Sequence, residues 1–477
     1  MEKLSIARRI ILDICKKAGK ENEMEYGLLG VVPVIILLGM AVWTRKCTSS
    51  MIMGCLTGCI ILGGGGFLTT FVDMIYVTGC DADTVWILVL LSLIGPVVAL
   101  LAKSGGPEAL SKLAAKKVKS EKSLFLWSWL LAAVLFIEDM MRSAVLGQLS
   151  PLYDKQKVPR ASLAYFIDAT STTITSLIPI TGWAVFFQGI FADFEELKGY
   201  GSGFDIYVKT IPYNFYAIAA LLVCFGFTMG WVPKIGGMKK AYILAKEEGI
   251  LYSDESAKLN PPVEHNRNID SVDKKGLGIL IFGIMLLTAV TIASEVLYGF
   301  IVCLMVLPVV LLLVKKATWK ELMETSMQGV RNTAEMVVIC FFVYFFKNVI
   351  TELQLPQYVI ETCGPFLSAQ MFPGVTFLAC CILTFCSGST WGVTVVYATI
   401  AVPMCIAIGA DPIIVLAAIL SGEAFGAHIC FYCDYTVYAS TCARINNIEH
   451  AFTQVPYGII GGVIAAIGFF ITGFAVV

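Results

Sequence analysis

Apolar runs of about 20 residues recur along the whole 477-residue chain and constrain its fold more than any other feature. A helix of that length spans the hydrocarbon core of a bilayer, so the repeated runs predict a multi-pass membrane protein. Only helices and closed barrels satisfy their backbone groups in lipid, and these runs lack the two-residue alternation of barrel strands. The chain is therefore expected to be all-α and to lie in a lipid bilayer, in the cell (inner) membrane.

The composition excludes several other classes of protein. Charged residues make up 14% of the chain and apolar residues 57%, whereas a soluble domain has about 25% charged residues. A net charge of −1 offers no electrostatic basis for a nucleic-acid partner. The 16 cysteines are scattered through apolar segments without metal-ligand spacing, and the sequence has no nucleophile or metal constellation of an enzyme. We therefore predict neither an enzyme nor a bound cofactor.

Basic loops indicate the topology of the first half. The apolar segment 123–153 lies between a lysine-rich loop and a second basic loop, so the positive-inside rule places both of its ends in the cytoplasm. Such a segment must turn within the membrane, and we predict a re-entrant helical hairpin with its turn near residues 138–143. The next span, 161–191, is followed by an acidic, external loop and is predicted to be interrupted in its hydroxyl-rich centre and at Pro179.

The second half repeats this plan. Residues 373–407 are predicted to form a second hairpin around the polar turn 387–392, and the span 412–441 is predicted to break at residues 421–426. By the count of spans, the first hairpin opens from the cytoplasm and the second from outside. The predicted fold is thus two inverted repeats, each of about five transmembrane helices plus one re-entrant hairpin, as in secondary transporters with a site at the midplane.

One long polar linker divides the chain. The predicted organisation is an interfacial N-terminal segment, a first inverted repeat, a lysine-rich cytoplasmic linker and a second inverted repeat, which occupy residues 1–26, 27–232, 233–275 and 276–477.

Acids within apolar segments are the leading candidates for chemistry, because an intramembrane acid is costly unless it has a function. Asp139, at the tip of the first hairpin, and Asp168, in the interrupted span, are predicted to bind Na⁺ or carry protons. Two structural alternatives stay open: Asp139 pairs with Arg142 to pin the turn, or Asp168 caps a helix. Oxygen ligands and a further proton carrier are predicted at Thr170, Thr172, Ser387, Ser389, Thr390 and Glu423.

A second group of residues is predicted to line a substrate or proton path. Arg142 is a ready partner for a carboxylate on a substrate, and His428 and Asp434 either titrate in a proton path or form a structural pair. His265 and His450 lie in polar segments and are assigned no role. The complete group is Glu138, Arg142, Trp183, His428 and Asp434.

Three motifs resemble one known family. PLYDKQKVPRASLAYFIDATSTT, residues 151–173, resembles the first signature of the NhaC-type sodium/proton antiporters, whose downstream Trp corresponds to Trp183. SGSTWGV, from residue 387, is similar to the family's Gly-x-Ser-Trp-Gly-Thr element. AAILSGEAFGAHICFYCDYTVYAST, from residue 417, is similar to its Ser-Gly-x-x-Phe-Gly-Asp-His pattern. The resemblance extends from about residue 30 to the end of the chain.

The resemblance implies cation-coupled transport of a small ion or a small organic solute, with Na⁺ or H⁺ as coupling ions. It favours Na⁺/H⁺ antiport, and the alternative is Na⁺- or H⁺-coupled transport of a small organic acid or amino acid. Two departures favour the alternative: Ala427 replaces the family's Asp before the histidine, and Arg142 stands where the hairpin turn is expected to be polar. Elevator-type relatives are commonly dimers, so a homodimer is the expected oligomer.

Overall fold

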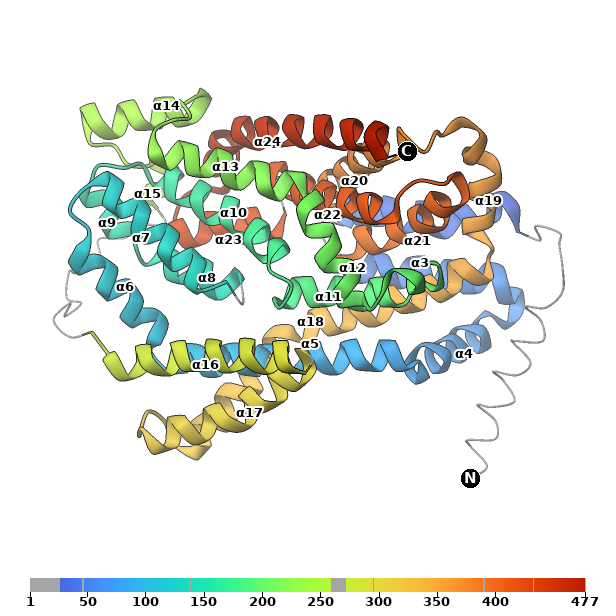
Figure 1. Cartoon of the computed structure of the whole chain (residues 1–477), viewed down its shortest axis with the longest axis horizontal. Coiled ribbons are helices and arrows are strands. Elements are labelled where there is room, and N and C mark those ends of the chain that lie inside the picture. The colour runs from blue at the N-terminus through green and yellow to red at the C-terminus, as the bar shows by residue number, and fades with distance from the viewer. Residues whose placement is uncertain are drawn as a thin grey trace.

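The computed structural model is helical throughout its regular structure. It describes residues 26–44, 47–136, 139–258, 272–294, 296–388, 391–431 and 433–476, and these ranges contain no strand. Within them, seven helices are long and apolar enough to cross a membrane, or up to nine if each of two bent helix pairs is one span. Most helices run along the long axis of the molecule (Figure 1). The predicted all-α, multi-pass fold is confirmed.

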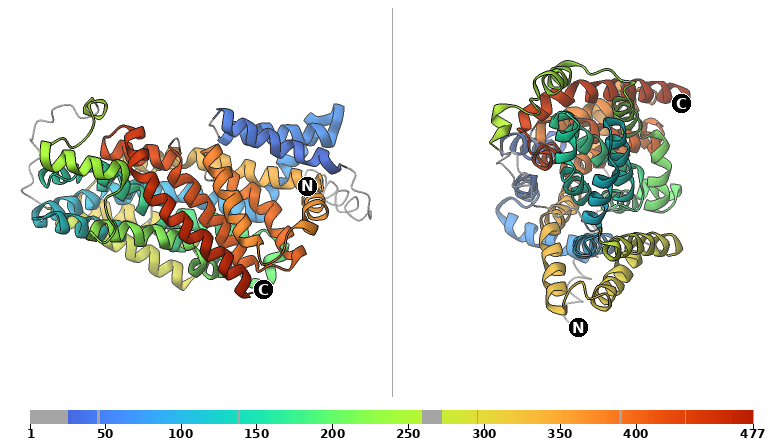
Figure 2. Two further views of the ribbon diagram at one scale, coloured as in Figure 1. Left: turned by 90° about the horizontal axis from the view of Figure 1, so that it is seen from above. Right: turned by 90° about the vertical axis from the view of Figure 1, so that its left-hand side faces the viewer.

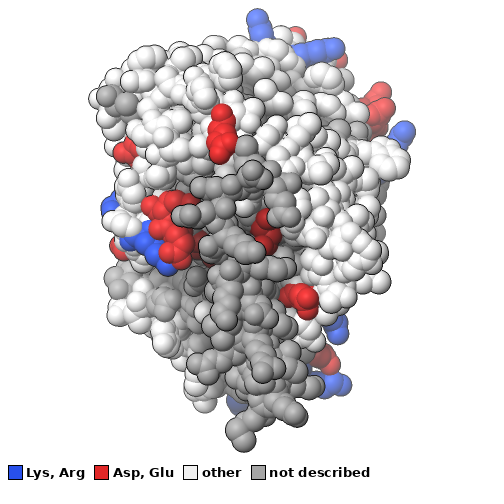
Figure 3. Space-filling view, turned by 90° about the vertical axis from the view of Figure 1, so that its right-hand side faces the viewer, with Lys and Arg blue, Asp and Glu red and all other residues white. Residues whose placement is uncertain are grey.

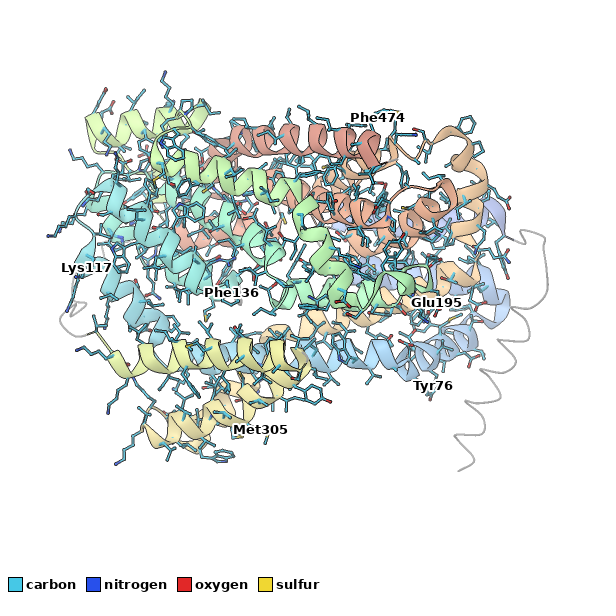
Figure 4. The ribbon with its side chains drawn as sticks, in the orientation of Figure 1. Tyr76, Lys117, Phe136, Glu195, Met305 and Phe474 are labelled. Carbon is cyan, nitrogen blue, oxygen red and sulfur yellow. The ribbon has the colours of Figure 1, made fainter. Side chains whose placement is uncertain are left out.

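The two ends of that long axis differ in charge. Figure 4 places Lys117, the last residue of α6 (Gly106–Lys117), at one end and Glu195, the first residue of η3 (Glu195–Tyr200), toward the other. We call these the basic end and the acidic end. In the face-on view of the acidic end, acidic side chains lie around its centre (Figure 3).

One group of helices, which we call the scaffold, combines segments from both halves of the sequence. Its central helices α5 and α18 cross so closely that a Cβ on Gly95 or Gly329 would overlap the carbonyl group of the other. The scaffold consists of α2 (Val32–Thr44), α3 (Cys47–Gly63), α4 (Phe67–Cys80), α5 (Ala82–Lys103), α16 (Lys274–Ala293), α17 (Val296–Leu313) and α18 (Trp319–Glu352).

The second group, which we call the core, also draws on both halves. In the end-on view of Figure 2, the yellow helices α16 and α17 of the scaffold lie below the core. Its two central helices, α10 and α22, are buried along almost their whole length, polar residues included. The core consists of α7 (Glu121–Val134), α8 (Asp139–Gly147), α9 (Ser150–Lys155), α10 (Arg160–Leu177), α11 (Gly182–Ala192), α12 (Gly203–Thr210), α13 (Phe215–Met229), α20 (Phe372–Ser387), α21 (Trp391–Ile408), α22 (Pro412–Ile429), α23 (Asp434–Ala443) and α24 (Asn447–Val476).

Core and scaffold meet where α11 packs on α5 and α21 packs on α18. Near the acidic end, Lys347 of α18 forms an ion pair with Asp193, which follows α11. Shorter helices connect and flank the two groups: η1 (Gly27–Val31), η2 (Gly64–Gly66), α6 (Gly106–Lys117), η3 (Glu195–Tyr200), η4 (Ile211–Tyr213), α14 (Gly236–Ile243), η5 (Leu244–Glu248), α15 (Asp254–Ala257), α19 (Leu355–Cys363) and η6 (Gly364–Phe366).

The first predicted hairpin is present. Lys246 bonds to the carboxylate of Glu121, at the start of α7, and to the carbonyl of Gln156, just after α9, at 2.9 and 3.3 Å. Both ends of the hairpin therefore meet at the basic end. α7 ends at Val134 and α8 begins at Asp139, where an acid stabilises the helix N-terminus, so most of the predicted turn, residues 139–143, is helical instead.

The second hairpin, α20 and α21, has the opposite direction. The start of α20 packs against the last turn of α24, close to Phe474, toward the acidic end (Figure 4). Gly388 ends α20 with a φ of +65°, a conformation that favours glycine, and so begins the predicted polar turn. The two hairpins therefore enter from opposite ends of the molecule, as the inverted-repeat prediction requires.

The structure agrees with the predicted bend at Pro179 and contradicts the predicted break in the second half. Around Pro179 the chain leaves α10 and continues in α11 with a bend of 43°, as predicted. The predicted interruption in the hydroxyl-rich centre of this span is wrong, because α10 is continuous from Arg160 to Leu177. The predicted break at residues 421–426 is wrong, because α22 runs unbroken through them to Ile429, and α23 begins at Asp434. Gly422 and Gly426 instead allow α22 to approach α20: a Cβ on either would lie 2.6 Å from the carbonyl oxygen of Phe377 or Cys381, respectively.

Candidate functional site

Asp168 lies in the middle of α10 and is buried in the core. Its Oδ2 accepts a hydrogen bond of 2.6 Å from Nε2 of Gln454 and lies 3.1 Å from Nε2 of His450. Its Oδ1 lies 3.8 Å from Nε2 of His428. One carboxylate thus stands between two imidazole rings, which come from α22 and α24.

Further contacts extend this cluster to a fourth helix. The hydroxyl of Tyr216, on α13, lies 2.7 Å from Nδ1 of His428. Nε2 of Gln454 also donates to the carbonyl of His428, at 2.6 Å. The amide group of this α24 residue is therefore bonded to both α10 and α22. No side chain of the cluster exceeds 3% exposure. We call these residues the Asp168 network: Asp168, Tyr216, His428, His450 and Gln454.

Helix ends position the two histidines. His428 lies in the last turn of α22, immediately before the chain departs from helix, and His450 lies in the first turn of α24. His450 and Gln454 are four residues apart and so share one helix face, which α24 presents to α10. Two helix termini therefore deliver polar side chains to the centre of an otherwise apolar core.

Several polar atoms of the network have no hydrogen-bond partner within the described ranges. They are Nε2 of His428, Nδ1 of His450 and Oε1 of Gln454. An unpartnered buried polar atom costs free energy unless water, an ion or a proton satisfies it. Na⁺ prefers oxygen ligands, and the side chains of Gln454 and Asp168 carry such oxygens. The chemistry of these residues therefore suits a small cation that is transported as a substrate.

The network can hold positive charge in two ways. A proton on either imidazole forms an ion pair with the buried carboxylate, and a metal cation bound to the carboxylate neutralises it instead. Both at once would place like charges within a few ångström of each other in a medium of low dielectric constant. A proton on the network and a cation at Asp168 would therefore exclude each other.

The hydroxyl-rich run that follows Asp168 is mostly bonded to its own helix. The Thr170 hydroxyl donates to the carbonyl of Phe166 at 2.7 Å, and Thr173, Thr175 and Ser176 make similar bonds. Such bonds are common for Thr and Ser in helices. Thr172 is also buried. These hydroxyls are satisfied within α10, and their lone pairs remain the predicted ligands.

Arg142, in α8, lies beside the same run. The side chain is fully buried, and Nη2 donates to the carbonyl of Ser171 at 2.6 Å. Ser171 lies one helical turn after Asp168, so a guanidinium group and the central carboxylate flank the same stretch of α10. Asp139 is half-buried at the start of α8.

Glu423 forms a separate buried acidic centre. It is fully buried in α22, within electrostatic range of the Tyr207 hydroxyl and the Cys380 thiol. Five residues separate it from His428, a rise of about 7.5 Å along the helix. The structure thus brings Asp168 and His428 together and keeps Glu423 apart from them.

The structure describes the remaining predicted site residues only in part. Trp183 is 5% exposed in the first turn of α11, and its ring packs on Phe187, with its indole N–H lacking a hydrogen-bond partner in the described part of the chain. Glu138, Ser389 and Thr390 lie outside the described residues. The backbone at Ser387 and Asp434 is described as helical, whereas their side chains are not described.

Sequence reasoning missed three members of the network. His450 was expected to have no role because it follows a polar stretch, and neither Tyr216 nor Gln454 was singled out. The spacing of His450 and Gln454 on one helix face was an available signal. Their partner, Asp168, lies 282 and 286 residues away in the sequence, and local patterns say nothing about such a pairing.

Part of the first signature motif has a structural role. Arg160 forms two hydrogen bonds with Asp154, of 2.8 Å from Nε and 2.6 Å from Nη2, and donates from Nη1 to the carbonyl of Ala443. This paired interaction ties α9 to the start of α10 and to the end of α23. It fixes the helix that carries Asp168.

Comparison with known proteins decides the family. The sequence pattern of the Na⁺/H⁺ antiporter family matches residues 174–474, which include every member of the network except Asp168. The chain belongs to the Na⁺/H⁺ antiporter family. The NhaC-type resemblance is thereby confirmed, and this family member is a cation-coupled transporter that lies in the lipid bilayer as a multi-pass protein.

Individual relatives are more distant. An uncharacterized protein of Haemophilus influenzae is 24% identical over 477 residues, with 93% of this chain and 90% of that protein covered. The malate-2H⁺/Na⁺-lactate antiporter of Bacillus subtilis is 30% identical over 161 residues, which cover 33% of this family member and 34% of the relative.

Two solved structures share the fold. MtrF of Neisseria gonorrhoeae, described as one of a class of antimetabolite efflux pumps, superposes with a TM-score of 0.61 at 16% identity, over 86% of this chain and 85% of its own. The YdaH transporter of Alcanivorax borkumensis, described as having an unusual topology, superposes with a TM-score of 0.58 at 13% identity, over 92% and 99%.

Proposed function

We propose that this transporter exchanges Na⁺ for protons at the Asp168 network. The observation that carries the proposal is a single buried carboxylate between two imidazole rings. A protonated imidazole pairs with Asp168 and displaces Na⁺, and loss of that proton frees the carboxylate to bind Na⁺ again. Alternate loading of one site is sufficient to couple two gradients.

The surrounding residues have supporting roles in this proposal. Gln454 and the hydroxyls of Thr170 and Thr172 supply neutral oxygen ligands, and Tyr216 orients the His428 ring through Nδ1. Asp139 and the hydroxyls of the second hairpin, Ser387, Ser389 and Thr390, are further proposed cation ligands or proton carriers. Glu423 carries a second proton or cation. No cofactor beyond the coupling ions and no enzymatic activity belongs to this function.

We infer that the basic end faces the cytoplasm of a cell in whose inner membrane the protein lies, because lysine-rich loops are retained on that side. The two inverted repeats are residues 27–232 and 276–477, and a homodimer is the expected oligomer. Access alternates as the core rocks or slides along the scaffold. The Lys347–Asp193 ion pair crosses that boundary near the acidic end and would have to break during the movement.

A second function is favoured by Arg142, which stands fully buried beside the hydroxyl-rich run of α10. A guanidinium group binds carboxylates through paired hydrogen bonds. The Bacillus subtilis relative is a malate and lactate antiporter by name, so Na⁺- or H⁺-coupled transport of a small organic acid or amino acid is the alternative.

Reconstitution in liposomes tests the two functions against each other. An imposed Na⁺ gradient should move protons, reported by an enclosed pH-sensitive dye, when no organic solute is present. Proton movement that requires an added dicarboxylate, hydroxy acid or amino acid would overturn Na⁺/H⁺ exchange in favour of the second function. Protein-free liposomes, treated identically, give the leak rate that must be subtracted.

A further inference from the structure

The described part of the linker is folded against the core. Residues 235–257, which we call the strap, contain α14, η5 and α15 and lie across the basic end of the molecule (Figure 1). Met238, Ala245 and Ser256 of the strap are fully buried. A linker that served only to join two repeats would have no need to bury side chains at three points along its length.

The first contact of the strap is with the ends of the first hairpin. Lys246 bridges Glu121 and Gln156, at 2.9 and 3.3 Å, and so closes the gap between the start of α7 and the end of α9. The Lys246 and Glu121 side chains are 44% and 34% exposed. This contact is at the surface and holds the strap in place without being buried.

The second contact is with α10, the helix that carries Asp168. The Arg160 amide donates to the carbonyl of Leu251 at 3.1 Å, and the Arg160 guanidinium lies 5.3 Å from the ring centre of Tyr252. The Ser162 hydroxyl donates to Sδ of Met238 at 3.4 Å. Six residues separate Ser162 from Asp168, so the strap covers α10 at about 9 Å from the network along the helix axis.

The third contact is with the start of α24. Oε2 of Glu449 accepts hydrogen bonds from the Ser253 hydroxyl at 2.6 Å and the Ser256 hydroxyl at 2.5 Å, and a weaker one from the Ser253 amide at 3.3 Å. Glu449 immediately precedes His450. Two serines of the strap therefore hold the residue next to a member of the network.

These contacts lie at the starts of α10 and α24, on the side of Asp168 that faces the basic end. We propose that the strap is the gate of the approach to Asp168 from the basic end, closed when Ser253 and Ser256 bind Glu449 and open when they release it. The inference rests on the proposed function only in taking the Asp168 network as the transport site. The structure has the gate closed, since every side chain of the network is at most 3% exposed.

Thiol labelling tests the gate directly. In a Ser162→Cys variant, which is nearly isosteric, the new thiol lies beneath Met238. A membrane-impermeant maleimide applied to the basic end in inside-out vesicles should label this cysteine slowly, as read by peptide-resolved mass spectrometry so that the native cysteines are scored separately. Adding Glu449→Ala should accelerate labelling by about tenfold or more, because it removes charge-assisted hydrogen bonds.

Glu255→Ala is the matched control, since it removes an exposed acid of the strap next to Ser256 and should leave the labelling rate unchanged. Equal labelling rates in Glu449→Ala and Glu255→Ala would overturn the gate, as would rapid labelling of the Ser162→Cys variant alone. If Glu449→Ala fails to fold, the Ser253→Ala/Ser256→Ala double variant removes the same bonds from the other side.

The labelling readout does not depend on Na⁺/H⁺ exchange. Accelerated labelling in a protein that moves no protons in response to Na⁺ would overturn the proposed function and leave the gate standing. Normal exchange with unchanged labelling would overturn the gate alone.

Discussion

Asp168 and Glu423 are both fully buried acids within the two most buried helices of the core, and each helix follows a hairpin in its half of the chain. Their surroundings differ. Asp168 has two imidazoles and an amide within 3.8 Å, whereas Glu423 stands between two glycines that pack α22 against the backbone of α20. Inverted repeats have thus contributed different parts: the first supplies the central carboxylate, and the second supplies its histidines from helix ends.

The largest effect is expected from Asp168→Asn. The amide keeps the shape of the side chain and removes the charge that both Na⁺ and a protonated histidine require. Coupled exchange in liposomes should fall by about 100-fold or more, equivalent to about 2.7 kcal/mol, while the protein still folds. Glu196→Gln, at an exposed acid of the acidic end, should retain the wild-type rate. Exchange at the wild-type rate in the Asp168 variant would show that Asp168 is not part of the transport site.

Glu423→Gln should have a smaller effect. Because Glu423 is not part of the Asp168 network, its neutralisation is expected to slow exchange by about tenfold or less, equivalent to about 1.4 kcal/mol. The same liposome measurement applies. A loss as complete as that of Asp168→Asn would show that the two acids act as one site and would end the distinction between them.

Replacing His450 by Gln should alter the pH dependence of Na⁺ binding. In the wild type, Na⁺ binding measured from about pH 8 down to about pH 5 should weaken, because a charged imidazole then occupies Asp168. The variant has one imidazole fewer, so the decline should be shallower. Na⁺-dependent thermal stabilisation measured across this pH range reports it, with His265→Gln in the linker as the control. An identical decline in the His450 variant would contradict a proton-carrying role.

The smallest effect on transport, but a clear one on stability, is expected from Gly422→Ala and Gly426→Ala. The added methyl group would lie 2.6 Å from a carbonyl oxygen of α20, so the two helices must separate. Overpacking of this kind costs about 1–3 kcal/mol. Thermal unfolding in detergent measures it, and Gly278→Ala, whose methyl meets open space on α16, should be neutral. Unchanged stability in both α22 variants would show that the helices have room to separate.

Much of the fold follows from local patterns. Apolar length predicts membrane helices, the two basic loops predict the first hairpin, and the polar turn 387–392 in a repeated plan predicts the second. Pro179 predicts the bend between α10 and α11. The same local reasoning failed at residues 421–426, because small residues indicate both an unwound helix and a close helix contact. The position of α20 decides between these, and only the packed structure reveals that position.

Hydrophobic length, charge placement and backbone chemistry can be read along the chain, and they already predict a helical membrane transporter with inverted hairpins and an acid at its centre. What surrounds that acid depends on the packing of the helices. Gln454 and the two histidines come from helices far away in the chain, and the linker proved to be a folded strap over the basic end. Such pairings depend on how the buried helices pack, because only packing brings residues that are distant in sequence close enough to pair with a buried carboxylate.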